Sequence, residues 1–197
     1  MRAGAERRSG MSWSPVCCFE TLPQEKVIRV QLTFSRSKEK IHIADDMKKQ
    51  AKLVIDTNIL VAATRNRHGP SFALMQTIRL KQVTMCCSPA LFLEYEDVLK
   101  RPDQLAASRL LASDIDAILN ELAGIIEPVT THYQWRPQLR DPSDEMVLEA
   151  AANAQAQAIV TYNLRDFGPA KHFGIAVLNP EQSFQQFHLS AQRSIKP

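Results

Sequence analysis

Acidic and amide side chains follow two apolar segments of this sequence, and such groups can bind a cation or contact a phosphate. Asp56 comes directly after the apolar residues 53–55 in the stretch LVIDTNIL. A second apolar run, AIVT at 158–161, leads into Asn163 and Asp166. Because ligands gather at the carboxyl ends of parallel strands, these side chains would share one site if the two strands were neighbours.

Two predicted helices carry further acids. One starts near Asp141 and has Asp144 in its first turn. The other starts at Pro89 and carries Glu94 and Glu96 on the two flanks of its apolar stripe. The helical period does not choose between these two glutamates, because both lie at the border of the buried face.

Each of these residues also has a structural interpretation. Asp56 could cap the helix that follows it. Asp141 is well placed as an N-cap, with Pro142 at the first helical position. Asn163 and Asp166 suit an ordinary turn, in which short polar side chains bond the local backbone.

Taken together, the acids indicate a metal site. Two carboxylates about 6 Å apart repel each other by roughly 3 kcal/mol at an effective dielectric constant of 20, so a cluster of three or four needs a cation. Oxygen ligands without His or Cys favour a hard ion, Mg²⁺ or Mn²⁺. Such ions serve phosphate chemistry by activating water and neutralising phosphoryl oxygens.

The elements that would position these residues alternate along the chain. Apolar runs typical of strands occupy 52–55, 82–87, 125–129, 158–161 and 175–178, and helical patterns occupy 70–80, 89–102, 113–124 and 141–155. This order predicts an α/β fold, a three-layer sandwich with a central, mostly parallel sheet. Cys86 and Cys87 lie in a predicted buried strand, and none of the four cysteines has the spacing of a zinc site.

The positive charge of the chain is concentrated at its N-terminus. Residues 1–50 contain ten Lys and Arg against six Asp and Glu, whereas the other 147 residues contain 14 against 15. We therefore expect one folded domain at 47–190, preceded by an extension at 1–46 without stable structure, apart from one possible strand at 27–34. The alternative is an arm that binds a partner. No apolar run reaches the roughly 20 residues that cross a bilayer, so we expect a cytoplasmic protein.

Four segments of the sequence resemble, in the correct order, the motifs of the PIN domain (PilT N-terminal) family. They are LVIDTNILVAA, SPALFLEYEDVLKRP, RDPSDEMVLEAA and IVTYNLRDF, and the resemblance spans residues 51 to about 184. It is strongest to the branch that contains toxin components of toxin-antitoxin pairs. The resemblance implies a ribonuclease dependent on Mg²⁺ or Mn²⁺, with its acidic site at the carboxyl ends of the strands.

The resemblance also implies roles for individual residues. Asp56, Glu94 and Asp144 match the three main acids of the family, expected as metal ligands, and this match selects Glu94 over Glu96. Many relatives have an aspartate where this chain has Asn163, so we take Asp166 as the fourth acidic catalytic group, and the number of metal ions stays open. Thr57, Asn58, Thr161 and Asn163 would orient water and the carboxylates. Candidate contacts to RNA phosphates are Arg65, Arg67, His68, Arg140, Arg165 and Lys171.

Other classes of protein fit the residues less well. A haloacid-dehalogenase-like phosphatase needs an acid two residues after Asp56, where this chain has Asn58, and a dinucleotide-binding domain needs a glycine-rich first turn. An RNA-processing nuclease that is not a toxin, or a non-catalytic RNA-binding or protein-binding module, remains as an alternative. The resemblance further implies a small antitoxin partner and a possible homodimer. For the apolar residues at 106–124, core packing is the preferred interpretation.

Overall fold

Five parallel strands form the centre of the structure, a computed structural model that describes residues 50–190. The extension expected at 1–46, with its possible strand, lies outside the described residues. The strands are β1 (Lys52–Ile55), β2 (Thr84–Cys87), β3 (Glu127–Pro128), β4 (Ala158–Val160) and β5 (Ala176–Leu178), in the order β3-β2-β1-β4-β5. All four pairings are parallel, and β1 lies beside β4. The predicted α/β fold is confirmed.

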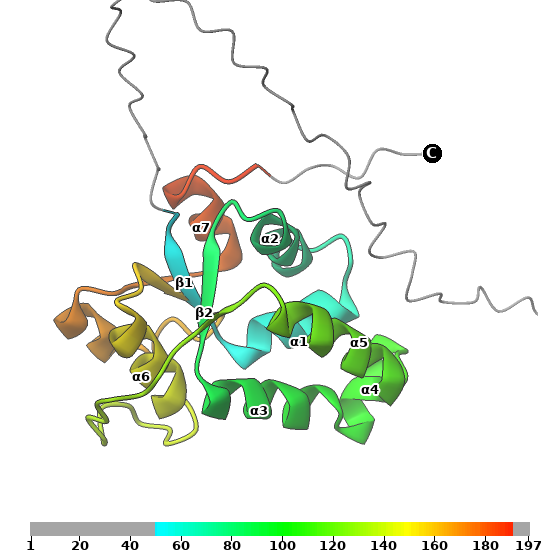
Figure 1. Cartoon of the computed structure of the whole chain (residues 1–197), viewed down its shortest axis with the longest axis horizontal. Coiled ribbons are helices and arrows are strands. Elements are labelled where there is room, and N and C mark those ends of the chain that lie inside the picture. Colours follow the sequence, from blue (N-terminus) through cyan, green and yellow to red (C-terminus); the bar gives the residue numbers. More distant parts are fainter. Residues whose placement is uncertain (1–49, 191–197) are drawn as a thin grey trace, which may run out of the picture. The chain divides into compact units, whose positions relative to one another are not determined.

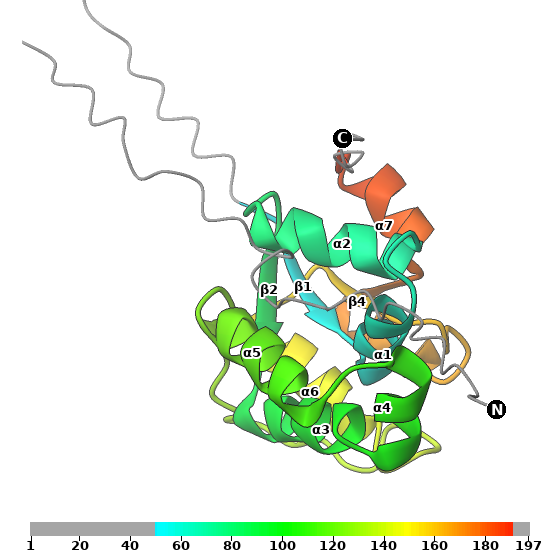
Figure 2. The same cartoon turned by 90° about the vertical axis from the view of Figure 1, so that its right-hand side faces the viewer.

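Helices cover the sheet, as Figures 1 and 2 show. They are α1 (Thr57–Arg65), α2 (Pro70–Arg79), α3 (Pro89–Leu99), α4 (Pro102–Ser108), α5 (Ala112–Ala123), α6 (Glu145–Ala154) and α7 (Pro180–Gln186), with a 3-10 helix, η2 (Gly168–Phe173). Figure 2 shows α2 on one side of β1 and β2 and α6 on the other. Helix α6 contacts β1, β2 and β4, and α2 contacts α7.

The composition of β1 explains its central place. Leu53, Val54 and Ile55 are all fully buried, which a strand needs when helices cover both faces of its sheet. In β2, Cys86 and Cys87 are buried free thiols, as expected from the sequence. Among residues 50–190, no helix is long and apolar enough to cross a membrane.

Helix α6 begins later than the sequence predicted. The expected N-cap, Asp141, instead accepts a hydrogen bond from the backbone amide of Ser143 (2.9 Å), and the N-cap position belongs to Asp144. A short aspartate side chain that bonds the backbone two residues on favours a turn over a helix. The prediction that Asp141 caps this helix is therefore wrong, although the helix itself is present.

Most of the apolar residues at 106–124 belong to the core. Leu110, Ile115 and Leu122 are buried, whereas the Leu111 side chain is 70% exposed. Core packing was the preferred interpretation of this segment, and it is correct for Leu110, Ile115 and Leu122 but not for Leu111. The segment also includes the end of α4, a short helix that lies almost entirely beyond the helical pattern predicted at 89–102.

Candidate active site

The Asp56 side chain lies at the carboxyl end of β1 and does not cap the helix that it precedes. Its residue occupies the N-cap position of α1, yet the carboxylate makes no capping hydrogen bond. Oδ2 instead accepts hydrogen bonds from Nδ2 of Asn58 (2.7 Å) and Oγ1 of Thr161 (2.5 Å). The backbone amide of Asp56 donates to the carbonyl of Val160 (2.9 Å), which fixes β1 against β4. Capping therefore does not explain this buried acid.

Asn58 and Thr161 form a small network around Asp56. Nδ2 of Asn58 also donates to Oγ1 of Thr161 (3.0 Å), and the backbone amide of Tyr162 donates to Oδ1 of Asn58 (3.3 Å). Thr161 is fully buried and accepts a hydrogen bond from the amide of Asn163 (2.9 Å). The end of β4 is thus connected to the end of β1 through side chains that also orient the carboxylate.

Glu94 is the acid of α3 that faces Asp56. Its Oε1 accepts a hydrogen bond from Oγ1 of Thr57 (3.0 Å), while Oε2 is buried and has no hydrogen-bond partner among the described residues. Glu96 instead forms a surface salt bridge with Lys100 (2.7 Å). A buried carboxylate oxygen without a partner carries a large desolvation cost, so Glu94 is the glutamate with unused binding capacity.

Tyr95 connects α3 to the same strand end, and sequence analysis missed this role. The side chain is fully buried, and its hydroxyl donates a hydrogen bond to the carbonyl of Ile55. Its position on the apolar stripe of α3 indicated burial but not a partner. This contact helps to set the position of Glu94, the preceding residue, relative to Asp56.

Asp144 joins the acidic group from α6. It occupies the N-cap position, but its carboxylate makes no capping bond. Burial is the largest cause that raises the pKa of Asp144, and together with the negative charges of Asp56, Asp141, Asp166 and Glu94 it brings this pKa to about 6. Since exposed charges beyond about 10 Å are largely screened, these contributions indicate that the acids lie near one another.

The pKa values of the other two main acids are also raised. Burial is the largest cause for both Asp56 and Glu94, and the hydrogen bonds from Thr161 and Thr57, respectively, oppose it. The charge of Asp56 raises the pKa of Glu94, and the charge of Asp166 raises that of Asp56. A divalent cation would remove this mutual repulsion.

Asp141 and Asp166 contribute charge from more exposed positions. Asp166 lies in the turn after β4, where its amide donates to the carbonyl of Asn163 (3.1 Å). Asp141 raises the pKa of both Glu94 and Asp144. We had interpreted Asp141 only as a helix cap. Its position three residues before Asp144 was the signal that could have placed it beside the site.

A pocket of about 630 Å³ opens beside Asp56 and Glu94. Asn58, Asn163 and Arg65 also line it, and Val61, Ala62 and Val98 form an apolar wall that the sequence patterns did not assign to the site. Asp144, Asp166, Arg140 and Arg165 are not among its lining residues. Of the six candidates for phosphate contacts, Arg65 is the one that lines this pocket.

The donor atoms suit a hard cation, although no finished coordination shell is present. Within residues 50–190, no group of three or more His, Cys, Asp or Glu is close enough to form a metal site as it stands. The available donors are carboxylate oxygens, one of them the buried, unpartnered Oε2 of Glu94. Oxygen-only donors of this kind match Mg²⁺ or Mn²⁺. Assignment of Asp56, Glu94 and Asp144 as ligands stays a prediction.

The protein is of the α/β class, with a parallel sheet and acids near its carboxyl edge. Comparison with known families identifies its family. Residues 52–165 match the model of the PIN domain. The chain belongs to the PIN domain family, whose members are generally nucleases that use divalent metal ions.

One solved structure that is similar to this chain is that of FitAB bound to an IR36 DNA fragment. The similarity has a TM-score of 0.45 and 17% sequence identity, and it covers 72% of this chain and 99% of that chain. No protein with a curated description matches this sequence.

Proposed function

We propose that this protein is a metal-dependent ribonuclease that hydrolyses RNA phosphodiester bonds. The observation that carries the proposal is a set of acids whose binding capacity the fold uses only in part. Asp56 and Asp144 occupy N-cap positions without capping, and Glu94 keeps a buried oxygen unpartnered. Membership of a family of nucleases supports the same reading.

Asp56, Glu94 and Asp144 are the residues that would hold Mg²⁺ or Mn²⁺, with Asp166 as a further negative group. When bound, the ion would supply activation of water and neutralisation of charge on the phosphoryl oxygens. The carboxylates are the only part of the described chain that we assign to this task.

Neighbouring side chains orient these carboxylates. Both side-chain hydrogen bonds to Asp56 end on Oδ2, and the bond from Thr57 ends on Oε1 of Glu94. These bonds orient both carboxylates, and Oε2 of Glu94 is left without a partner among the described residues. Partners of this type tune the affinity of metal sites by about 10–100-fold.

Arginines around the site would hold the RNA backbone. Arg65 lines the pocket, and Arg140 and Arg165 are exposed on the segments that carry Asp144 and Asp166. Arginine contacts to phosphate position a nucleic acid without reading its sequence. We assign these residues to binding and not to the chemical step.

A role as the toxin of a toxin-antitoxin pair is part of the proposal. It rests on the resemblance of the four sequence motifs to that branch of the family, as do the antitoxin partner and the homodimer. Growth arrest on expression without a partner gene would support the toxin role. Normal growth with RNA cleavage in vitro would leave a nuclease that acts in RNA processing.

The test of the nuclease activity is cleavage of RNA by the purified full-length protein. We expect cleavage with Mg²⁺ or Mn²⁺, none with EDTA, and a loss in the variant Asp56→Asn. Asp97→Asn is the matched control, because Asp97 pairs with Arg101 on the surface of α3. Cleavage that survives EDTA, or equal rates in Asp56→Asn and the wild type, would contradict the proposal.

A further inference from the structure

An exposed aromatic cluster lies on the segment that leads into the acidic site. The rings of Tyr133 and Trp135 stack with centroids 5.5 Å apart and an interplanar angle of 28°. The ring of Trp135 also packs against that of Phe173 in η2, with ring centroids 5.4 Å apart. Tyr133 is 66% exposed and Trp135 is 40% exposed, so this stack is not core packing. We call these three side chains the aromatic cluster.

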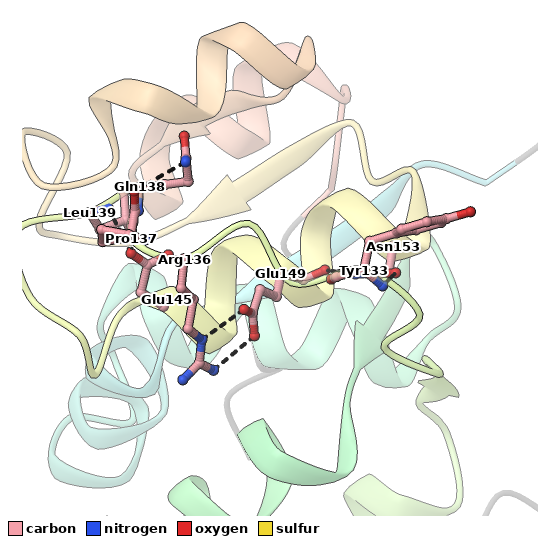
Figure 3. A network of polar contacts seen from close by, with 8 residues as sticks. All are labelled: Tyr133, Arg136, Pro137, Gln138, Leu139, Glu145, Glu149 and Asn153. Atoms are coloured by element: carbon pink, nitrogen blue, oxygen red, sulfur yellow. Dashed lines mark hydrogen bonds and ion pairs between the residues drawn. The ribbon is translucent and has the colours of Figure 1, made fainter.

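Helix α6 holds the segment under the aromatic cluster with three polar side chains, spaced four residues apart (Figure 3). Asn153 accepts hydrogen bonds from the amides of His132 (3.0 Å) and Tyr133 (3.1 Å), and it donates to the carbonyl of Tyr133 (3.0 Å). Glu149 forms two hydrogen bonds with the guanidinium of Arg136 (2.7 and 2.9 Å).

The third contact fixes the end of the segment next to the site. Glu145 is buried, and its Oε1 accepts hydrogen bonds from the amides of Gln138 (2.5 Å) and Leu139 (2.8 Å). The segment has almost no regular secondary structure of its own, yet its backbone is held at two places and the side chain of Arg136 at a third. A stack held in this way loses little conformational entropy when a flat ligand binds it.

The charged residues within the two segments that carry the aromatic cluster are all basic, although Arg136 is paired with Glu149 of α6. Residues 129–140 contain His132, Arg136 and Arg140 and no acid, and residues 167–180 contain Lys171 and His172 and no acid. Arg140 and Lys171 are exposed and form no salt bridge with any described residue. Aromatic faces beside unpaired cations match a nucleic acid strand, whose bases stack while its phosphates need positive charge.

The position of the cluster relative to the acids agrees with such a strand. The segment runs along α6 from Asn153, beside Tyr133, to Glu145, which follows Asp144. Asn153 is nine residues beyond Asp144, which corresponds to about 13 Å along a helix at 1.5 Å per residue. A few nucleotides of extended RNA cover such a distance.

We propose that the stacked rings of Tyr133 and Trp135, with Arg140 and Lys171, bind unpaired bases and phosphates of a single-stranded RNA and lead that strand to the acidic site. The proposal deepens the proposed function and rests on it for the identity of the nucleic acid. It makes single-stranded RNA the preferred substrate over a duplex, whose bases are already stacked and paired.

The main experiment measures binding without cleavage. The full-length protein would be titrated in EDTA with a fluorescein-labelled single-stranded 12-nucleotide RNA of mixed sequence, followed by anisotropy. We expect Tyr133→Ala and Trp135→Ala each to weaken binding by about tenfold, the scale found for base stacking on an aromatic ring. Tyr133→Phe should bind like the wild type, since it keeps the ring. Leu111→Ala, which removes another exposed apolar side chain, should have no effect.

A spectroscopic measurement tests stacking directly. The sequence has two tryptophans, Trp13 and Trp135, so a Trp13→Phe background leaves Trp135 as the sole indole. Binding of RNA should quench its fluorescence, and a duplex of the same sequence should quench it less. The variants Arg140→Ala and Lys171→Ala should each reduce the slope of log affinity against log salt by about 0.7, as expected for one phosphate contact on a single strand.

These measurements separate this proposal from the nuclease activity. Weaker RNA binding in the ring variants supports the proposal even if the wild type does not cleave RNA. Unchanged binding in both alanine variants, with no quenching of Trp135, overturns it even if the wild type is an active nuclease. Ring variants that bind RNA normally but lose a co-purified protein partner would likewise overturn it, in favour of a protein-binding surface.

Discussion

Two sets of acids on helices α3 and α6 differ in how the fold uses their carboxylates. Glu145 and Glu149 are almost fully buried, and each accepts two hydrogen bonds from the segment at 136–139. Glu94 and Asp144, in contrast, keep oxygens that no described residue uses for capping or pairing. Burial alone therefore does not distinguish the acids that we propose as metal ligands, whereas unused hydrogen-bonding capacity does.

The largest expected effect compares two glutamates on the same helix. Glu94→Gln should lower the rate of RNA cleavage at least about 100-fold, since loss of a mere supporting partner of a metal ligand already costs about 10–100-fold. Glu96→Gln, two residues away, should leave the rate unchanged because Glu96 pairs with Lys100 at the surface. Initial rates at saturating Mg²⁺ measure this difference. A similar loss of cleavage rate in both variants would show that the negative charge of α3 as a whole matters, and not Glu94 in particular.

A smaller effect concerns stability. Glu149→Gln removes the charge that holds Arg136, and we expect the free energy of unfolding to fall by about 1–2 kcal/mol, a value reduced because Arg136 is partly exposed. Urea unfolding followed by circular dichroism measures the change. Asp144→Asn is the comparison variant and should not lose stability without metal. If both variants lost the same free energy of unfolding, the two sets of acids would not differ in their contribution to stability.

The smallest effect is a dependence on pH. The pKa of Asp144 is raised from 3.8 to about 6, so the folded protein holds this proton more tightly than the unfolded chain. The contribution of Asp144 to stability is therefore fully present below about pH 4 and is lost as the pH rises through about 6.

Thermal melts in EDTA can measure this contribution. Asp144→Asn should melt a few degrees higher than the wild type at pH 7.5 and show no such gain at pH 4, as about 1 kcal/mol moves the midpoint by roughly 2–4 °C in a chain of this length. Adding Mg²⁺ at pH 7.5 should raise the midpoint of the wild type more than that of the variant. A gain at pH 4 as large as at pH 7.5 would exclude repulsion at Asp144 as the cause.

The strands and the position of Asp56 could be predicted because their signals are local. Apolar runs of four to six residues mark buried strands wherever the rest of the chain lies, and Asp56 follows one of them directly. The pairing of β1 with β4 was a further assumption from the alternation of strands and helices, and it is confirmed.

The acids on helices were less predictable because their roles depend on distant residues. Glu94 and Glu96 both flank the apolar stripe, and only the position of Thr57 on α1 distinguishes them physically. Asp141 was the predicted cap, and its hydrogen bond from the amide of Ser143 shows that it lies in a turn before the helix. The family resemblance selected Glu94 and Asp144 where periodicity could not.

The contacts under the aromatic cluster could not be predicted from the pattern of apolar residues. Glu145, Glu149 and Asn153 are four residues apart and share a face of α6, but polar residues at this spacing are typical of a solvated face. Their partners belong to a segment of irregular backbone with no period to detect. Only the folded structure reveals that this polar face is an internal surface.

The hydrogen bond between Thr161 and Asp56 joins residues 105 positions apart, which has a consequence for synthesis on the ribosome. A nascent chain that has not yet extended beyond β4 possesses Asp56 and Glu94 but lacks the hydroxyl that orients the first of them. The acids can therefore reach their final arrangement only after nearly the whole domain has been translated. Under the proposed function, an unfinished polypeptide would lack an assembled acidic site while it is still close to the RNA of its own translation machinery.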